Sequence, residues 1–172
     1  MEGCPRVIER GDKEVIRQIV AAIEASGGVK VLDVDPGEAT NRTVVTFVGE
    51  PEAVVEAAFA GVKAAAERID MRHHKGAHPR MGATDVLPLV PVSGITLEEC
   101  AALSRELARR IADELHVPTY CYEAAAFRPP RPHLARPRAW HYAALPAQLA
   151  RPRPPPASGA PPQPHRLPPP GT

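Results

Sequence analysis

The stretch "VKVLDVDPGEATNRTVVTFVG" (residues 29–49) decides the fold, because two short strand patterns lie in it on either side of a polar connection. Residues 29–35 are apolar and β-branched, with Gly-Gly before them and Pro-Gly after them. Residues 42–49 have the same character. We therefore expect two strands that are neighbours in the chain, and the Asp-Pro-Gly between them reads equally well as an ordinary turn or as the end of a functional strand.

Helical patterns flank this strand pair. Asp12 is a suitable N-cap for a helix whose apolar residues share one face, and the Gly-Gly pair ends that helix. Pro51 opens an Ala-rich helix that runs to about Ile69. Residues 96–99 form a capping box, which predicts an amphipathic helix to about Leu115.

Three further strands complete the expected sheet. Residues 85–92 are apolar but contain two prolines, which places this strand at an edge or gives it bulges. Residues 117–124 predict a last short strand, and residues 1–8 a first one. The resulting order is typical of an α+β ferredoxin-like sandwich, with a mixed or antiparallel sheet and helices packed on one face. The other face would be free for a ligand or a second domain.

Composition divides the 172 residues into an acidic body and a basic tail. Residues 1–123 carry 14 Lys+Arg and 20 Asp+Glu, a formal charge of −6, whereas the rest of the chain has seven Arg and no acid. Fifteen of the 22 prolines fall between Pro129 and Pro170. We predict one domain over residues 1–149 and a disordered Pro/Arg-rich tail over residues 150–172, since such a composition cannot bury enough apolar surface to offset chain entropy.

Several classes of protein are disfavoured. Cys4, Cys100 and Cys121 are too widely spaced for a disulfide framework or a metal-ligand pattern. The chain shows neither a run of about 20 apolar residues nor the pattern of a signal peptide, so the expected location is the cytoplasm, without membrane association. The acidic body argues against a nucleic-acid partner.

The polar stretch "HHKGAHPRMGATD" (residues 73–85) is the first candidate site. A zinc site would need its histidines on one helical face, which the glycine and proline beside them oppose, so no metal is expected. His73 and His74 fit exposed loop positions. His78 lies between Lys75 and Arg80, whose charges would lower its pKa and favour the neutral imidazole of a general base acting on an anionic substrate.

The second candidate site surrounds the turn between the first two strands. We expect Asp33 and Asp35 to point to opposite faces, one toward the helices or the strand end and the other toward the open side of the sheet. Arg42 follows Asn41 and could pair with a substrate carboxylate or with one of these aspartates. With Lys75 and Arg80, it would form a clamp for a polyanion.

Two long motifs, "NRTVVTFVG" and "IDMRHHKGAHPRMGA", occur here in the order found in one enzyme family. From about residue 12 to residue 149 the chain resembles the N-terminal subdomain of the glutamate formimidoyltransferase (formiminotransferase) family. The resemblance implies transfer of the formimidoyl group of N-formimidoyl-L-glutamate to N5 of the co-substrate tetrahydrofolate, a step of histidine degradation and one-carbon metabolism. It implies His78 as the catalytic base, with Asp35 orienting it.

The same family adds a second, similar subdomain, and its ligands bind between the two. Here residues 159–172 do not match the family's Gly-rich folate-contacting segment, and "CPRVIERGDKEV" lacks the family's Asn-Phe-Ser-Glu loop. The alternative is therefore a truncated or frameshifted, inactive module that binds folate or another protein. The open sheet face would then be the interface of a homodimer or the contact surface for the missing subdomain. Recruitment of an SH3-type partner by the "RPRPPP" tail is a third, weaker hypothesis.

Overall fold

An antiparallel sheet and three α-helices make up the part of the chain that the computed structural model describes, namely residues 1–7, 9, 12–37, 42–71 and 82–126. The elements are, in order, β1 (Glu2–Gly3), β2 (Arg6–Val7), α1 (Lys13–Ala25), β3 (Val29–Gly37), β4 (Arg42–Gly49), α2 (Pro51–Arg68), β5 (Thr84–Val86), β6 (Leu89–Val90), α3 (Leu97–Leu115) and a 3-10 helix, η1 (Glu123–Ala125).

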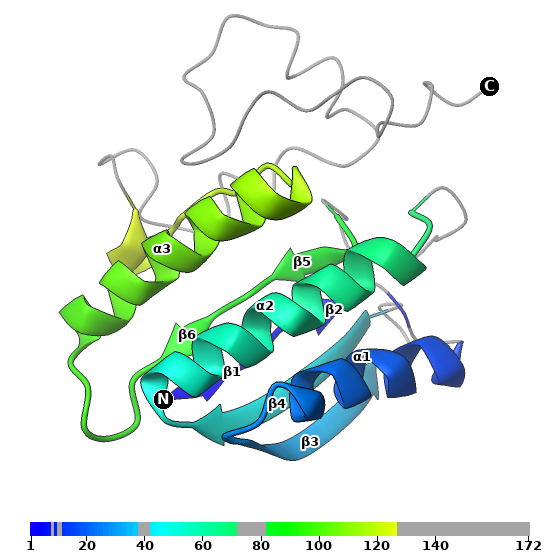
Figure 1. Ribbon diagram of the computed structural model, residues 1–172, viewed down its shortest axis with the longest axis horizontal. Helices are drawn as coiled ribbons and strands as arrows, with labels where there is room; N and C mark the ends of the chain where they lie inside the picture. Colours follow the sequence, from blue (N-terminus) through cyan, green and yellow to red (C-terminus); the bar gives the residue numbers. More distant parts are fainter. Residues whose placement is uncertain (8, 10–11, 38–41, 72–81, 127–172) are drawn as a thin grey trace, which may run out of the picture.

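The sheet has the strand order β5-β2-β4-β1-β6, and β3 pairs with the other edge of β4. Strands β1 and β2 both pair with β4, so they act as one strand broken around Pro5, and β5 and β6 form a second broken strand beside them. The sequence of elements is thus β-α-β-β-α-β with α3 added. Figure 1 shows the helices gathered on one side of the sheet, which confirms the predicted α+β sandwich.

The helix ends follow the local chemistry that the sequence predicts. The side chain of Asp12 accepts hydrogen bonds from the backbone N–H groups of Glu14 and Val15, and Thr96 and Glu99 form the predicted capping box. Pro51 occupies the first turn of α2. Between α1 and β3, Gly27 and Gly28 have φ values of +76° and +72°, which side chains rarely permit. Each cap satisfies backbone groups that the helix itself leaves unpaired.

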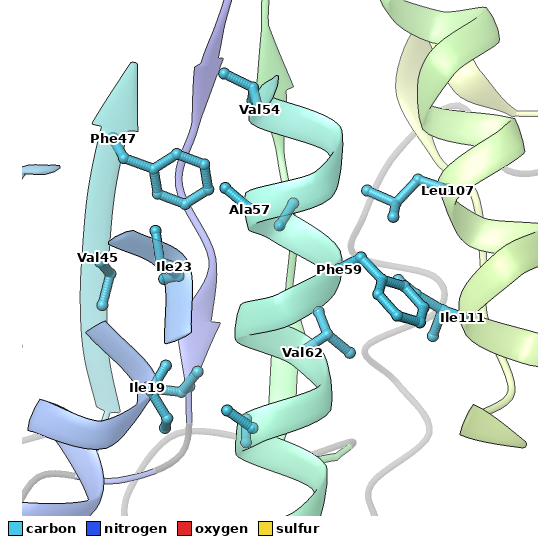
Figure 2. Close-up of a cluster of buried hydrophobic side chains, with 14 of the residues drawn as sticks. Ile19, Ile23, Val45, Phe47, Val54, Ala57, Phe59, Val62, Leu107 and Ile111 are labelled. Atoms are coloured by element: carbon cyan, nitrogen blue, oxygen red, sulfur yellow. The ribbon is translucent and has the colours of Figure 1, made fainter. Parts of the chain in front are cut away.

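The main core lies between β4 and the two helices that cover it. Phe47 and Val45 of β4 pack beside Ile23 and Ile19 of α1, and all four side chains are fully buried (Figure 2). The opposite side of α2 packs on α3, where Phe59 lies near Ile111 (Figure 2). Burial of side chains this large provides most of the stability of a small domain.

A polar contact also joins α3 to α2. The Arg110 guanidinium lies 4.0 Å from the centre of the Phe59 ring and pairs with Glu56 and with Glu114 at 2.5 and 2.9 Å. The two carboxylates raise the pKa of Arg110 above its usual value, with the hydrogen bond to Glu56 as the largest cause. The guanidinium of Arg110 therefore stacks over the aromatic ring while it pairs with two carboxylates at the surface.

One expectation about the strands was wrong, and one alternative that the sequence left open is decided. Residues 117–124 form only a single bridge at Thr119 followed by η1, because Arg105 of α3 donates to the carbonyl oxygens of Ala124 and Ala125 and holds this segment against the helix instead. The Asp-Pro-Gly after residue 34 is not a turn, since β3 continues to Gly37, which pairs with Arg42. Pro36 is tolerated because β3 is an edge strand.

The predicted disordered tail lies outside the described residues. None of the helices in the described ranges is both long enough and apolar enough to cross a membrane.

Candidate functional site

Strand β4 separates two chemically different faces of the sheet. Thr43, Val45 and Phe47 face the helices and are fully buried. The alternate residues, Arg42, Val44, Thr46 and Val48, are only half-buried and point to the other side. We call this second side the open face. It carries the candidate site.

A β-bulge at Leu32 determines what β3 places on the open face. Val31 pairs with Phe47 and Asp33 with Thr46, so Leu32 is the extra residue, and its side chain is 53% exposed. Beyond the bulge, Val34 pairs with the buried Val45. Because of the bulge, Val31 and Val34 both face the helices although they are three residues apart in the chain.

Asp33 and Asp35 consequently lie together on the open face. Their partners are Thr46 and Val44, which both point to that side. The expectation that the two carboxylates face opposite ways was therefore wrong, because side chains two residues apart in a strand share a face. Both aspartates are exposed.

The structure brings together two of the predicted site residues, Asp35 and Arg42. Asp35 pairs with Val44 and Gly37 with Arg42, so Asp35 and Arg42 are diagonal neighbours on adjacent strands. Such positions lie about 7–8 Å apart, within reach of an arginine side chain. A carboxylate and a guanidinium are therefore presented side by side at one end of the open face.

The other predicted residues, Asn41, Lys75, His78 and Arg80, lie outside the described residues. Some of the described residues near them in the chain nevertheless meet. Gly37 pairs with Arg42, whose neighbour Thr43 pairs with Val7, and Val7 pairs with Thr84. Gly37, Arg42 and Thr84, which are described residues close to the two segments in the chain, thus lie at the same end of the sheet.

Buried polar contacts hold this end of the sheet to α1. The Thr43 hydroxyl donates to the carbonyl oxygen of Glu9, and the Glu9 carboxylate accepts from the backbone N–H of Asp12. Thr43 is fully buried and Glu9 is 5% exposed. Because buried polar groups are costly unless paired, these bonds fix how the chain leaves β2 and enters α1.

A thiol occupies the middle of the open face. Cys4 Sγ donates to Glu2 Oε1 at 2.9 Å and lies 3.8 Å from the Thr46 hydroxyl. Burial and then the bond to Glu2 raise the pKa of Cys4 to about 11. Cys4 is thus a protonated hydrogen-bond donor at neutral pH, and its position and pKa do not suit a nucleophile.

Sequence reasoning missed Arg6, the third charged residue near this end of the open face. Arg6 pairs with Val44 and is therefore diagonal to Arg42 on the side away from Asp35. Its Nε atom is buried and has no hydrogen-bond partner among the described residues. Strand β2 has only two residues and follows a proline, so the sequence has no alternating pattern that would show which face of the sheet Arg6 occupies. Only the pairing of β2 with β4 shows it.

The described part of the chain contains no group of three or more His, Cys, Asp or Glu side chains arranged to hold a metal ion. The polar groups of the open face are guanidinium, carboxylate and hydroxyl groups beside apolar side chains, and of these the guanidinium groups are suited to bind a carboxylate.

Comparison with known proteins shows the family of this chain. The family model for the N-terminal subdomain of the formiminotransferase domain matches residues 1–167. The chain belongs to this family. Among curated relatives of this formiminotransferase subdomain, the rat formimidoyltransferase-cyclodeaminase is 48% identical over 149 residues, which is 87% of this chain and 28% of the rat protein.

Shorter microbial relatives carry the transferase name alone. The glutamate formimidoyltransferase of Streptococcus pyogenes serotype M1 is 43% identical over 149 residues, 87% of this chain and 50% of that protein. The enzyme of the same name from Thermoplasma acidophilum is 46% identical over 135 residues, 78% of this chain and 45% of that protein. The chain therefore spans about a quarter to a half of the length of these relatives.

Proposed function

We propose that this formiminotransferase subdomain acts in the transfer of the formimidoyl group from N-formimidoyl-L-glutamate to N5 of tetrahydrofolate, the co-substrate. The names of the relatives support this reaction class. The observation that carries the proposal is the placement of Asp35 and Arg42 as neighbours on the open face. They lie at the same end of the sheet as Thr84, which follows the segment containing His78 in the chain.

Each residue has a task in the proposed reaction. The N5 lone pair of tetrahydrofolate attacks the formimidoyl carbon, and His78 removes the proton from N5 as the tetrahedral intermediate forms. The bond from that carbon to the glutamate nitrogen then breaks, and the proton passes to the leaving nitrogen. Asp35 orients the imidazole, while Asn41, Arg42, Lys75 and Arg80 hold the carboxylates in near-attack geometry.

The open face supplies one wall for this reaction. In the proposal, a second subdomain or a second copy of the chain supplies the other wall, and the cytoplasm is the compartment. The alternative is a module that binds folate without turnover.

A transfer assay with purified protein tests the proposal. Wild-type protein is mixed with N-formimidoyl-L-glutamate and tetrahydrofolate, and formation of 5-formimidoyltetrahydrofolate is followed. His78→Ala should lower the rate by about 10²- to 10⁴-fold, the range for loss of a general base. His73→Ala, a nearby residue with no assigned task, is the matched control and should retain the wild-type rate.

The assay also separates the alternatives. An active His78→Ala variant would contradict the assigned role. Wild-type protein that binds tetrahydrofolate in a titration but never transfers the group would favour the binding module.

A further inference from the structure

We propose that Arg6 binds a carboxylate of a glutamyl group on the open face, together with Arg42. The inference rests on the proposed function, which it deepens by adding a binding residue that neither the motifs nor the relatives' names indicate. Its basis is the register of β2 against β4 and the state of the Arg6 side chain.

The first observation is an unmet donor. Arg6 Nε is buried and has no hydrogen-bond partner among the described residues. A guanidinium donor without a partner in an apolar setting is costly, and native structures rarely retain one without a reason. The backbone partners of Arg6 on both sides are valines, Val44 and Val86. An anion that reached this position would therefore bind in surroundings that strengthen an ion pair.

The second observation is the proximity of two like charges. Arg6 and Arg42 are diagonal neighbours across β2 and β4, about 7–8 Å apart. Two guanidinium groups at this spacing are able to bind the same anion. A glutamyl group carries two carboxylates, and guanidinium groups bind carboxylates through paired hydrogen bonds.

Three carboxylates of the chain lie near this position, those of Asp85, Asp35 and Glu2. Asp85 is the extra residue of the β5 bulge opposite Arg6 and Val7, and it makes a contact of its own. Asp35 lies beyond Val44 in the same row, two strands from Arg6, which corresponds to about 10 Å. The Glu2 carboxylate accepts from Cys4 instead. The register places neither Asp35 nor Glu2 between the two arginines.

Both substrates of the proposed reaction contain a glutamyl group, so the test has an arm for each. Affinities of N-formimidoyl-L-glutamate, of its diamide with both carboxylates neutralised, and of tetrahydrofolate are measured by calorimetry on the wild type, Arg6→Gln and Arg6→Lys. Lys30→Gln is the matched control, because it removes one positive charge from the far end of the same face, where Lys30 pairs with Val48.

Arg6→Gln should weaken binding of the substrate whose carboxylate it holds by about 10- to 100-fold, the value of a hydrogen bond to a charged group. Arg6→Lys should recover part of this loss. Binding of the diamide should be unchanged by Arg6→Gln, and Lys30→Gln should change each affinity by less than about threefold. Thermal unfolding should show that every variant is folded.

Equal losses of affinity in Arg6→Gln and Lys30→Gln would overturn the inference. They would show that binding depends on the overall positive charge of the face and not on Arg6 itself. It would also be overturned by unchanged affinities in Arg6→Gln, or by wild-type protein that binds none of the carboxylate ligands. Carboxylate binding that depends on Arg6 in a chain without transferase activity would instead sustain the inference and contradict the proposed function.

Discussion

The two faces of β4 differ in what they contribute. On the helix side, Thr43, Val45 and Phe47 are fully buried and pack under α1 and α2. On the open face, the intervening residues stay half-buried and belong to a surface with charges of both signs. Because side chains alternate along a strand, one eight-residue segment supports the core and the candidate site at once. Substitutions on the helix side should therefore affect stability, and substitutions on the open face should affect ligands.

The helix face should give the largest loss of stability. Phe47→Ala removes a fully buried ring and should lower the free energy of unfolding by about 3–5 kcal/mol, as expected for a large cavity. Val48→Ala, the adjacent open-face residue, should cost less than about 1 kcal/mol. Urea unfolding followed by circular dichroism measures both values. Similar losses for the two variants would refute the division between the faces.

A smaller loss is expected where the first strand passes under the same ring. A Cβ atom at Gly3 would lie 2.8 and 2.9 Å from two atoms of the Phe47 ring. Gly3→Ala should therefore cost about 1–3 kcal/mol through overpacking. In the Phe47→Leu background the same change should cost much less, because the edge of the ring is gone. A double-mutant cycle of urea unfolding measures this coupling, and additive losses would exclude the contact as the cause.

The open face contains a thiol, that of Cys4, which should react slowly with alkylating reagents. With a pKa of about 11, only about one Cys4 side chain in a thousand is a thiolate at pH 8, so alkylation by iodoacetamide should be slow. Glu2→Gln replaces the charged acceptor of the thiol by a neutral amide oxygen and removes a negative charge that raises this pKa, so labelling should become faster. Peptide mass spectrometry follows the rate, with Glu24→Gln on α1 as a control that should leave it unchanged.

The same pKa predicts a pH effect on stability. The pKa of Cys4 rises from its usual 9.0 to about 11 in the folded chain, so the folded state binds the proton more tightly than the unfolded state does. This contribution is complete below pH 9.0 and is lost as the pH rises from there through about 11. Cys4→Ser should flatten the fall in melting temperature across that window; an unchanged slope would assign the effect to other groups.

The smallest change in stability is expected for the two open-face aspartates. Asp33→Asn and Asp35→Asn should each alter the free energy of unfolding by less than about 0.5 kcal/mol, because both side chains are exposed. Only Asp35→Asn should slow formimidoyl transfer, since Asp35 is the neighbour of Arg42. A pair of variants with equal transfer rates would remove Asp35 from its proposed role.

The sequence predicted those elements whose ends are defined by local chemistry. Asp12 and the capping box at Thr96 mark helix starts that the structure confirms, because a cap requires only nearby backbone groups. The β3–β4 pair was also predicted. The strand expected over residues 117–124 failed because Arg105 on α3 holds that segment, a contact made between residues distant in the chain.

The arrangement of the candidate site was only partly predictable. Asp35 and Arg42 could be proposed from residue type, but their shared face depends on the bulge at Leu32 and on the pairing of β3 with β4. Arg6 could not be found from the sequence, because its position relative to Arg42 follows from the register of a two-residue strand. Facing and register are set by packing across the whole sheet, and a linear pattern does not contain them.

The most direct test is an NMR titration of the ¹⁵N-labelled chain with N-formimidoyl-L-glutamate and tetrahydrofolate. If the open face binds the substrates, the amide signals of Arg6, Asp35 and Arg42 should shift, while those of Ile23 and Ala57 in the helices stay unchanged. Shifts that concentrate on α1 and α2 and leave these three residues unaffected would contradict the assignment of the open face as the substrate-binding side.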